Sequence, residues 1–482
     1  MSISSSFLQP SARRFSLADE RFPVLTPTSV SASESRLQRP AQPMFLKTHD
    51  VATSVSSSGW IAASSSDQIR LYNVREAIGE GSRNRKIPPV RTLSIALAKN
   101  EEFRAIALSE DLLAVITHDR LLVYDEYRTS PDLARNRLDS RSISQTQTWT
   151  PKSVAILQTG TASEGAMASI AVGGEGENGV KVFKYMYTSG WNAENDRPIL
   201  RCPQNNGAIK VVGFSPPRSD AISVSMVFAL TTGNRLFCWA VGGSLGPSGG
   251  SLNPCWHFDC NSTSNERTYR DEITSAAFIV SPTGSPYILC TVENRPGSHL
   301  HSTFIVAIDV HGRNPYMVRQ GMKPIPDTVV GPSVLTGIAS SSGRFLVVME
   351  KGKKSGNMKL LTVQGAPDGG LTCVAAQMQT WEAKLQGSGT DTSTISMSIR
   401  EEQGILEIIA VDGRGHVVSS KVRVPGLTAF QPAYRYPRSP RSPTSVELQQ
   451  NVIMRELSSD ESSRASIATS HHATDRRDII PG

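Results

Sequence analysis

The stretch WIAASSSDQIRLYNV, residues 60–74, reads as an apolar strand, a tight polar turn and a second apolar strand. Six further stretches repeat this pattern, and their first residues follow at intervals of 52, 56, 58, 61, 58 and 61 residues. They are LLAVITHDRLLVYDE from Leu112, ASIAVGGEGENGVKVFKY from Ala168, MVFALTTGNRLFCWAV from Met226, YILCTVENRPGSHLHSTFIVAIDV from Tyr287, FLVVMEKGKKSGNMKLLTV from Phe345 and LEIIAVDGRGHVVSSKV from Leu406. A nearly constant period of this length is typical of a repeat fold in which each repeat supplies one structural unit.

Each repeat has room for two more strands. A strand is predicted before most of the pairs, as in FRAIALS at 103–109 and IKVVGFS at 209–215, because Val, Ile and Phe favour strands. A fourth, more exposed strand fits in the connections, for example VRTLSIAL at 90–97. Four antiparallel strands in each of seven units predict an all-β fold, a seven-bladed β-propeller.

Both ends of the chain differ in composition from the repeats. Residues 1–46 and 426–482 are rich in Ser, Pro and Arg and have no hydrophobic periodicity, so we expect two disordered tails around a propeller at 47–425. The last repeat has only three predicted strands. We expect residues 44–48 to supply its fourth strand and close the ring, because an open stack of sheets would leave sticky, unpaired edges.

The charge distribution bears on the class of partner. The net charge is +7, of which residues 1–48 contribute +3 and residues 423–482 contribute +2, so the repeats are close to neutral. A nucleic-acid-binding domain concentrates basic residues on one face of its fold. The sequence therefore argues against nucleic-acid binding by the repeats and leaves only the tails as a basic surface.

Cysteine use and the apolar runs bear on the compartment. Six cysteines are scattered without a disulfide-like framework, and no apolar stretch is long enough for a transmembrane helix. Residues 1–20 lack the apolar core of a secretory signal; their Ser and Arg content leaves a transit peptide open, although Asp19 and Glu20 follow at once. We predict a location in the cytoplasm, the nucleus or both.

A family resemblance appears in the first repeat. ASSSDQIRLYNV, residues 63–74, resembles the second and third strands of a WD-repeat blade, which read as an apolar strand, Ser, an Asp turn and then Ile-Arg-Leu-Trp-Asp. Tyr72-Asn73 stands where Trp-Asp would be, and the second repeat places Tyr124-Asp125 there. The other repeats depart further, and the Gly-His pair that usually precedes the first strand is missing. The resemblance covers residues 44–424. It implies a WD-repeat-like propeller that serves as an assembly platform without catalysis.

One subfamily of such propellers binds phosphoinositides through a Phe-Arg-Arg-Gly motif. The nearest string in this chain, Asn294-Arg295-Pro296-Gly297, has a proline in place of an arginine. We therefore expect no membrane-binding site of this kind.

Two further patterns have a structural and a chemical interpretation. Cys255, His257 and Cys260 could supply three zinc ligands, but structural zinc normally has a fourth ligand and a tighter cysteine spacing, so we expect an ordinary strand or loop. The glycine-rich segment 173–179 follows a strand but has neither the Lys-Ser/Thr pair nor the helix of a phosphate-binding loop. It predicts a hairpin turn.

Polar residues in the predicted turns are candidates for an active site. His118-Asp119 and Asp412 fit the capping of blades, whereas propeller enzymes of the lactonase kind place carboxylates and histidines around the central channel. The sequence contains no nucleophile elbow or metal-hydrolase signature. We predict no catalytic, metal or cofactor residues and expect replacement of His118 or Asp412 to affect stability alone.

The tails contain short motifs that protein kinases recognise. Ser16 follows two arginines, Ser439 and Ser442 each precede a proline, and Ser458 lies next to acidic residues. These four serines are our candidate phosphosites, and solvated disorder without modification is the alternative. Residues 445–457 could form a short helix, but its apolar residues divide between two faces.

These observations lead to one functional prediction and two alternatives. We predict a non-catalytic protein–protein scaffold or adaptor, monomeric by itself, regulated by phosphorylation of its tails and without a cofactor. The first alternative is a propeller hydrolase or lactonase. The second is a protein that binds membrane surfaces or nucleic acid through its basic tails.

Overall fold

The computed structural model describes residues 11–17 and, apart from gaps in the connections, residues 52–423. All of these residues belong to one compact unit, Met1–Ala429. In this part of the chain, strands dominate and the only helix is α1 (Val74–Gly79). Asn73 precedes α1, and its Oδ1 accepts hydrogen bonds from the backbone N–H groups of Arg75 (3.1 Å) and Glu76 (3.4 Å). The helix therefore begins with a capping residue.

The described strands form seven sheets, numbered here in chain order. The strands of the first three are, in sheet 1, β2 (Thr53–Val55), β3 (Trp60–Ser64), β4 (Gln68–Asn73) and β6 (Arg91–Ser94); in sheet 2, β7 (Phe103–Leu108), β8 (Leu112–Thr117), β9 (Arg120–Asp125) and β10 (Leu138–Ser142); and in sheet 3, β11 (Thr150–Gln158), β12 (Met167–Glu175), β13 (Val180–Met186), β14 (Gly190–Trp191), β15 (Ile199–Leu200) and β19 (Ser251–Leu252).

The remaining sheets follow the same antiparallel plan. Their strands are, in sheet 4, β16 (Ile209–Phe214), β17 (Met226–Thr231), β18 (Arg235–Ala240) and β20 (Trp256–Asp259); in sheet 5, β21 (Glu272–Val280), β22 (Pro286–Glu293), β23 (Ile305–Val310) and β24 (Val318–Pro324); in sheet 6, β25 (Val334–Ala339), β26 (Phe345–Lys351), β27 (Gly356–Gly365) and β28 (Leu371–Ala383); and in sheet 7, β29 (Ser396–Glu402), β30 (Ile405–Val411), β31 (His416–Arg423), β1 (Ser11–Leu17) and β5 (Lys86–Ile87).

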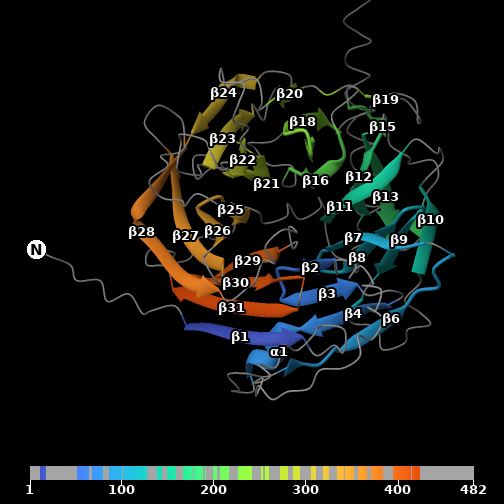
Figure 1. Cartoon of the computed structure of the whole chain (residues 1–482), viewed down its shortest axis with the longest axis horizontal. Coiled ribbons are helices and arrows are strands. Elements are labelled where there is room, and N and C mark those ends of the chain that lie inside the picture. Colours follow the sequence, from blue (N-terminus) through green and yellow to red (C-terminus); the bar gives the residue numbers. More distant parts are fainter. Residues whose placement is uncertain are drawn as a thin grey trace, which may run out of the picture. The chain divides into compact units, whose positions relative to one another are not determined.

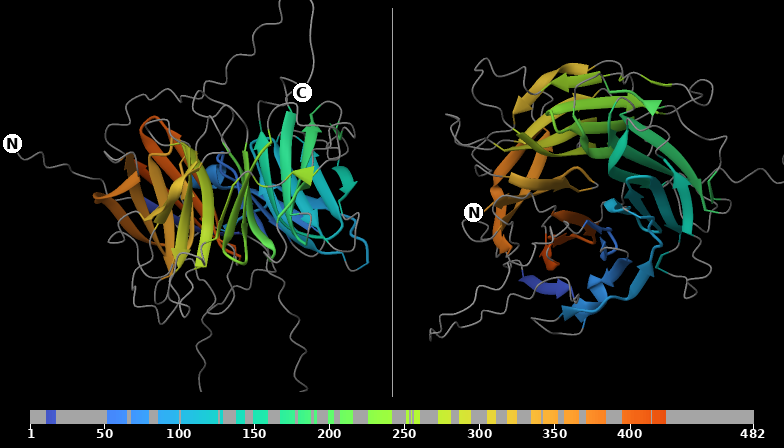
Figure 2. Two further views of the ribbon diagram at one scale, coloured as in Figure 1. Left: turned by 90° about the horizontal axis from the view of Figure 1, so that it is seen from above. Right: turned by 45° about the vertical axis from the view of Figure 1, so that its right-hand side comes forward.

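The sheets are arranged in a closed ring, seen along its axis in Figure 1 and from two other directions in Figure 2. The first strand of each sheet contacts the first strand of the next, in the order β2, β7, β11, β16, β21, β25, β29 and back to β2. A ring of radially arranged antiparallel sheets is a β-propeller. The all-β propeller predicted from the sequence is therefore confirmed.

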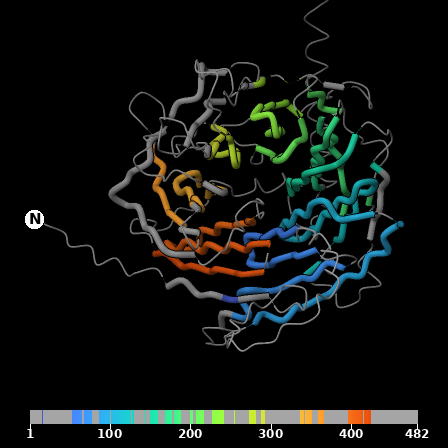
Figure 3. The backbone as a smooth tube through the Cα atoms, viewed as in Figure 1, coloured from blue at the N-terminus to red at the C-terminus, as the bar shows by residue number. Residues whose placement is uncertain are grey.

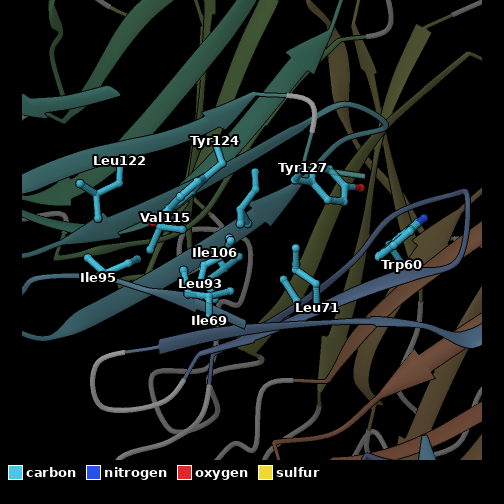
Figure 4. Packing of buried hydrophobic residues seen from close by; sticks show 12 residues of the cluster. Trp60, Ile69, Leu71, Leu93, Ile95, Ile106, Val115, Leu122, Tyr124 and Tyr127 are labelled. Carbon is cyan, nitrogen blue, oxygen red and sulfur yellow. The ribbon is translucent and has the colours of Figure 1, made fainter. Parts of the chain in front are cut away.

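Neighbouring sheets pack face to face, which explains the composition of the strands. Every residue of β3, β8 and β17 is buried, because the second strand of a sheet lies between two other sheets. The outer strand β6 has only one buried residue in four. Figure 4 shows the packing between sheets 1 and 2, where Ile69 and Leu71 of β4 lie near Val115 of β8 and Ile106 of β7. Burial on both faces is why these strands appear as unbroken apolar runs in the sequence.

A serine marks the end of the first strand in four of the sheets. In each case its Oγ accepts a hydrogen bond from the backbone N–H of the residue that begins the second strand, at 3.0–3.2 Å. These serines are Ser56, Ser109, Ser215 and Ser340. The same side-chain contact recurs because each sheet must reverse its chain tightly at the same place.

Sheet 7 contains strands from both ends of the described chain. β1 pairs antiparallel with β31, with Ser11 opposite Lys421 and Ser16 opposite His416, and it pairs in parallel with the two residues of β5. Figure 3 shows sheet 7 beside sheet 1. The ring is therefore completed by a strand from the N-terminal side. The sequence predicted such a strand because the last repeat has only three of its own.

The position of that closing strand differs from the prediction. It is Ser11–Leu17 rather than 44–48, and residues 44–48 lie outside the described part of the chain. The expectation of a disordered tail over 1–46 does not hold for these seven residues. The physical reason is Phe15, which is buried together with Val417 of β31 and Ile87 of β5. A single aromatic residue in a Ser/Arg-rich segment was too weak a periodic signal to indicate a strand.

Candidate interaction surfaces of the ring

The antiparallel order of the strands gives the ring two faces with different turns. The turns between the first and second strands of the sheets form what we call the first-turn face. The turns between the second and third strands lie at the opposite ends of the strands and form the second-turn face. On the first-turn face, Ser57 and Ser58 donate hydrogen bonds to Glu110 of the next sheet, and Ser342 donates one to Glu401 of the next sheet, so the turns lie close to the neighbouring sheet at these two places.

The first-turn face carries a polar network that spans three sheets. Arg128 lies between two acidic residues, with Nη1 3.2 Å from Glu110 Oε2 and Nη2 2.5 Å from Asp111 Oδ1. From sheet 3, Gln158 donates from Nε2 to Asp111 Oδ2 at 2.7 Å. From sheet 1, the backbone N–H of Ser58 donates to Glu110 Oε1 at 3.0 Å, and the hydroxyl of Ser57 also donates to this oxygen. We call these six residues the Glu110 network.

The Glu110 network is partly open to solvent. The exposed fractions of the side chains are 38% for Glu110, 26% for Arg128 and 18% for Asp111. Burial alone would lower the pKa of Arg128, but its hydrogen bond to Asp111 and the nearby carboxylates raise it overall. The network therefore holds the positive charge of Arg128 in place at this face, between two acidic side chains.

A simpler version of the same contact occurs between sheets 6 and 7. There Ser342 donates from its hydroxyl to Glu401 Oε1 at 2.7 Å. Ser57 and Ser342 each belong to a Ser-Ser-Ser-Gly turn, at 56–59 and 340–343. A serine of one turn paired with a glutamate of the next sheet is thus a recurring link along this face.

The second-turn face contains a buried ion pair. Glu101 has a side chain that is 1% exposed, and Arg120 donates to both of its carboxylate oxygens, from Nε at 2.8 Å and from Nη2 at 2.6 Å. The hydroxyl of Thr117 donates at 2.5 Å and the backbone N–H of Ala98 at 2.8 Å. Burial alone would raise the pKa of Glu101, but these hydrogen bonds and the charge of Arg120 together lower it to about 2.

The turn residues considered as an active site make local contacts. Asp412 is fully buried, accepts the backbone N–H of His416 at 2.8 Å, and lies 2.9 Å from Nδ1 of the same histidine. His118 Nε2 lies 3.0 Å from Oδ2 of the adjacent Asp119. Asp412 and His416 thus stabilise one hairpin turn, and His118 and Asp119 lie in another, so these contacts bring no groups together from different sheets.

The glycine-rich segment is a hairpin, as the sequence predicted. β12 and β13 pair antiparallel on either side of it. A Cβ on Gly174 would lie 2.3 Å from the ring of Trp149, and the indole Nε1 donates to the carbonyl of Gly179 at 3.3 Å. Lys181 lies over the same ring at 4.1 Å. Gly174 is thus required by the close approach of Trp149.

Of the three candidate zinc ligands, the structure describes His257 alone. Cys255 and Cys260 lie outside the described residues, and His257 of β20 stacks on Phe237 at a ring separation of 6.1 Å. Within the described ranges there is no group of three or more potential metal ligands. Cys238 and Cys290 are buried in β18 and β22, and burial raises the pKa of Cys202 to about 12.

Three of the four candidate phosphosites, Ser439, Ser442 and Ser458, lie outside the described residues, whereas Ser16 is part of β1. No helix in the described chain is long and apolar enough to cross a membrane. Among the described large apolar side chains, those exposed to solvent are Val90 and Ile405. The described surface therefore exposes few large apolar side chains.

The sequence did not reveal the Glu110 network. Its contacts between sheets join residues that are 47, 52 and 53 positions apart, close to one repeat period, and no local motif connects them. The available signal was the recurrence of Ser-Ser-Ser-Gly at two equivalent turns, together with an acidic residue at the corresponding place in the next repeat.

Comparisons with known proteins gave likeness in structure alone. No family model matches the chain, and no curated protein matches it. Among solved structures, the chain is similar to the WD40 domain of Neurospora crassa Pan2, with 8% identity over 77% of this chain and 88% of that one and a TM-score of 0.43. It is also similar to the N-terminal domain of Nup159, with 10% identity over 77% and 88% and a TM-score of 0.39. A third is Hsv2 of Kluyvelomyces marxianus, with 10% identity over 67% and 82% and a TM-score of 0.36.

Proposed function

We propose that the chain is a non-catalytic scaffold that binds other proteins through the faces of its propeller, in the cytoplasm, the nucleus or both. The observation that carries this proposal is the use of the polar turn residues. Glu101, Asp412 and Glu110 hold turns or link sheets, and each already accepts hydrogen bonds from the chain itself. Such residues stabilise a platform and do not form a convergent set of nucleophile, base and acid.

The first-turn face is the better candidate for partner contact. The Glu110 network offers charged groups that are both held in place and partly exposed, which lowers the entropy lost on binding. Because the described surface exposes few large apolar side chains, recognition there would rest on charge and hydrogen bonds.

Affinity purification of the full chain with matched surface variants tests this proposal. Arg128→Glu reverses a charge of the first-turn face. Lys152→Glu reverses one on the second-turn face, where Lys152 pairs with Glu175 at 3.2 Å. We expect stoichiometric protein partners that Arg128→Glu releases and Lys152→Glu retains, with both variants folded. A substrate turned over by the wild type, with turnover abolished by His118→Ala or Asp412→Asn in a folded chain, would replace the scaffold with an enzyme.

Phosphorylation of the tails is the regulatory part of the proposal. Ser439 and Ser442 lie among Arg435, Arg438 and Arg441. A phosphate adds about −1.5 to −2 charges at neutral pH, so two of them would make this basic segment neutral or acidic and alter the set of partners. Mass spectrometry of this peptide should find the phosphates, and the double Ala variant should bind a changed set of proteins. An unmodified peptide in all growth conditions would contradict this part.

A further inference from the structure

Sheet 7 closes the ring, and at the edge of β31 it depends on a segment that is distant in sequence, β1. β1 covers this edge through six consecutive register pairs, from Ser11 opposite Lys421 to Ser16 opposite His416. Without β1, the backbone groups of β31 on this side would form an unpaired edge, which is a template for another strand.

One side chain of β1 is anchored in the core. Phe15 is 5% exposed and packs in one apolar cluster with Val417, Ile409 and Ile87. The docking position therefore has two parts: the backbone edge of β31, and an apolar site opposite Val417 that takes a large side chain. We call this position the strand groove.

The tether of β1 to the rest of the ring is long. Residues 18–52 separate β1 from β2, a stretch that can span roughly 3.3–3.6 Å per residue when extended. A tether of this kind supplies its end at an effective concentration of about a millimolar or less. A segment of another protein at lower concentration therefore displaces β1 only if it binds the edge of β31 more tightly than β1 does.

The sequence of β1 is not adapted to strong pairing. SARRFSL contains no Val, Ile, Thr, Tyr or Trp, although these residues favour strands by their cross-strand packing. A segment with β-branched residues around a central aromatic would fit the same groove with higher affinity. A second copy of this chain has no such advantage, because it brings the same weak strand without the local tether.

We propose that the strand groove is a peptide-binding site that β1 occupies as an internal placeholder, and that its physiological ligand is an extended segment of a partner protein. The segment lies antiparallel to β31, carries a Phe, Tyr or Trp opposite Val417, and has β-branched neighbours. Binding of this kind is strand addition at a sheet edge, with pockets that select alternate side chains. The inference rests on the proposed scaffold function only in that the ligand is a protein.

Peptide binding to the full chain tests the groove. The probes are a labelled synthetic peptide with the sequence of residues 10–18, a second one in which the residues on either side of the Phe are Val, and a control with Ala in place of the Phe. Fluorescence anisotropy is measured with the wild type and with full-chain Phe15→Ala, which weakens the internal competitor. We expect both Phe peptides to bind Phe15→Ala at least about tenfold more tightly than the wild type, the Val peptide to bind best and the Ala peptide not to bind.

A second variant covers the case in which Phe15→Ala does not fold. Arg14→Pro removes a backbone donor from β1 and leaves the core side chains in place. If either variant is unfolded alone, the Phe peptides should restore the melting transition of that chain. Absence of binding and of rescue would overturn the proposal. So would equal binding of the Ala peptide.

Two other outcomes of these experiments can be told apart from peptide binding. A dimer of the wild-type chain that the Phe peptides dissociate would assign the groove to a second copy and overturn the choice of ligand. Failure of the groove would leave the proposed function intact if Arg128→Glu still releases a partner, because the Glu110 network lies apart from β1 in sheets 1 to 3.

Discussion

The contact between sheets 1 and 2 differs in its construction from the contact between sheets 7 and 1. The first is formed by residues 60–127, one continuous stretch of chain, with twelve buried residues in its apolar cluster. The second, which we call the closing seam, joins residues 15–87 to 409–417, with nine buried residues. Consecutive sheets are joined by a short connection, whereas the closing seam must bring together distant segments and overcome the larger entropy of that closure.

Polar contacts reinforce the closing seam. Arg75 of α1 donates to Glu407 of β30 at 2.6 Å, and the hydroxyls of Thr53 and Ser396 lie 3.0 Å apart between β2 and β29. The contact between sheets 1 and 2 also has polar links, from Ser57 and Ser58 to Glu110, and in addition a connection held in place by Glu101 and Arg120. The comparison indicates that the closing seam is less secure than the contact between sheets 1 and 2, and that β1 is the element on which this seam depends.

The largest effect is expected from removal of β1. Deletion of residues 1–20 should lower the free energy of unfolding by at least about 3 kcal/mol, the cost of losing one buried aromatic side chain. Deletion of residues 1–9, which leaves β1 whole, is the matched control and should leave the melting temperature nearly unchanged. Equal melting temperatures for the two deletions would show that β1 does not stabilise the closing seam.

Phe15→Ala and Leu113→Ala each remove one buried apolar side chain. The first tests the closing seam and the second tests the contact between sheets 1 and 2. Both side chains are buried, at 5% and 0% exposure, so each change should cost about 3 kcal/mol. Their local effects should differ. Phe15→Ala should speed hydrogen exchange and proteolysis of β1 and β31, whereas Leu113→Ala should lower stability without a selective effect on sheet 7. The same exchange pattern in both variants would show that the closing seam is no weaker than the other contact.

Acid should affect the contact between sheets 1 and 2 through Glu101. Its pKa is lowered from 4.5 to about 2 in the folded chain, so its contribution to stability is fully present above pH 4.5 and is lost as the pH falls from 4.5 to 2. The contribution is about 3 kcal/mol, at roughly 1.4 kcal/mol per pKa unit. Denaturant titrations at several pH values should show this loss in the wild type and a flatter profile in Glu101→Gln. If Glu101→Gln has the same pH profile as the wild type, Glu101 is not the source of the stability lost in acid.

A smaller effect is expected from the ion pair across the closing seam. Arg75→Ala leaves Glu407, whose side chain is 10% exposed, with the more distant Lys421 at 3.6 Å. Because Arg75 is itself 30% exposed, the cost should be about 1–2 kcal/mol. His118→Ala is the control on an exposed turn and should change stability by less than about 0.5 kcal/mol. Chemical denaturation would contradict the account if His118→Ala cost more than Arg75→Ala.

Much of the fold could be predicted from the sequence because each repeat carries its own apolar pattern. Trp60, Leu112 and Phe345 begin buried second strands, as expected from the unbroken apolar runs. The place of β1 could not be predicted, because Phe15 gains its burial from Val417, about four hundred residues away. A single apolar residue has no periodicity, and only the closed ring gives it partners.

The polar surfaces were harder to predict than the strands. His118 and Asp412 were correctly placed in turns, where the turn chemistry is local in sequence. Glu110 and Asp111 were not predicted, because the contacts that fix them come from adjacent sheets about one period away, and Arg128 was not predicted because it pairs with these two residues. Prediction of such a site requires the register of one repeat against the next.

The register of β1 on β31 can be measured directly with paired cysteines in the full chain. Ala12 lies opposite Ser420, and directly opposed residues on antiparallel strands are close enough for a disulfide, whereas diagonal neighbours are not. In dilute protein under mild oxidation, Ala12→Cys with Ser420→Cys should form an intramolecular disulfide that peptide mapping identifies and that raises the melting temperature. The control pair, Ala12→Cys with Val418→Cys, should not form one. Absence of the first cross-link, or equal yield of the two, would contradict closure of the ring by β1.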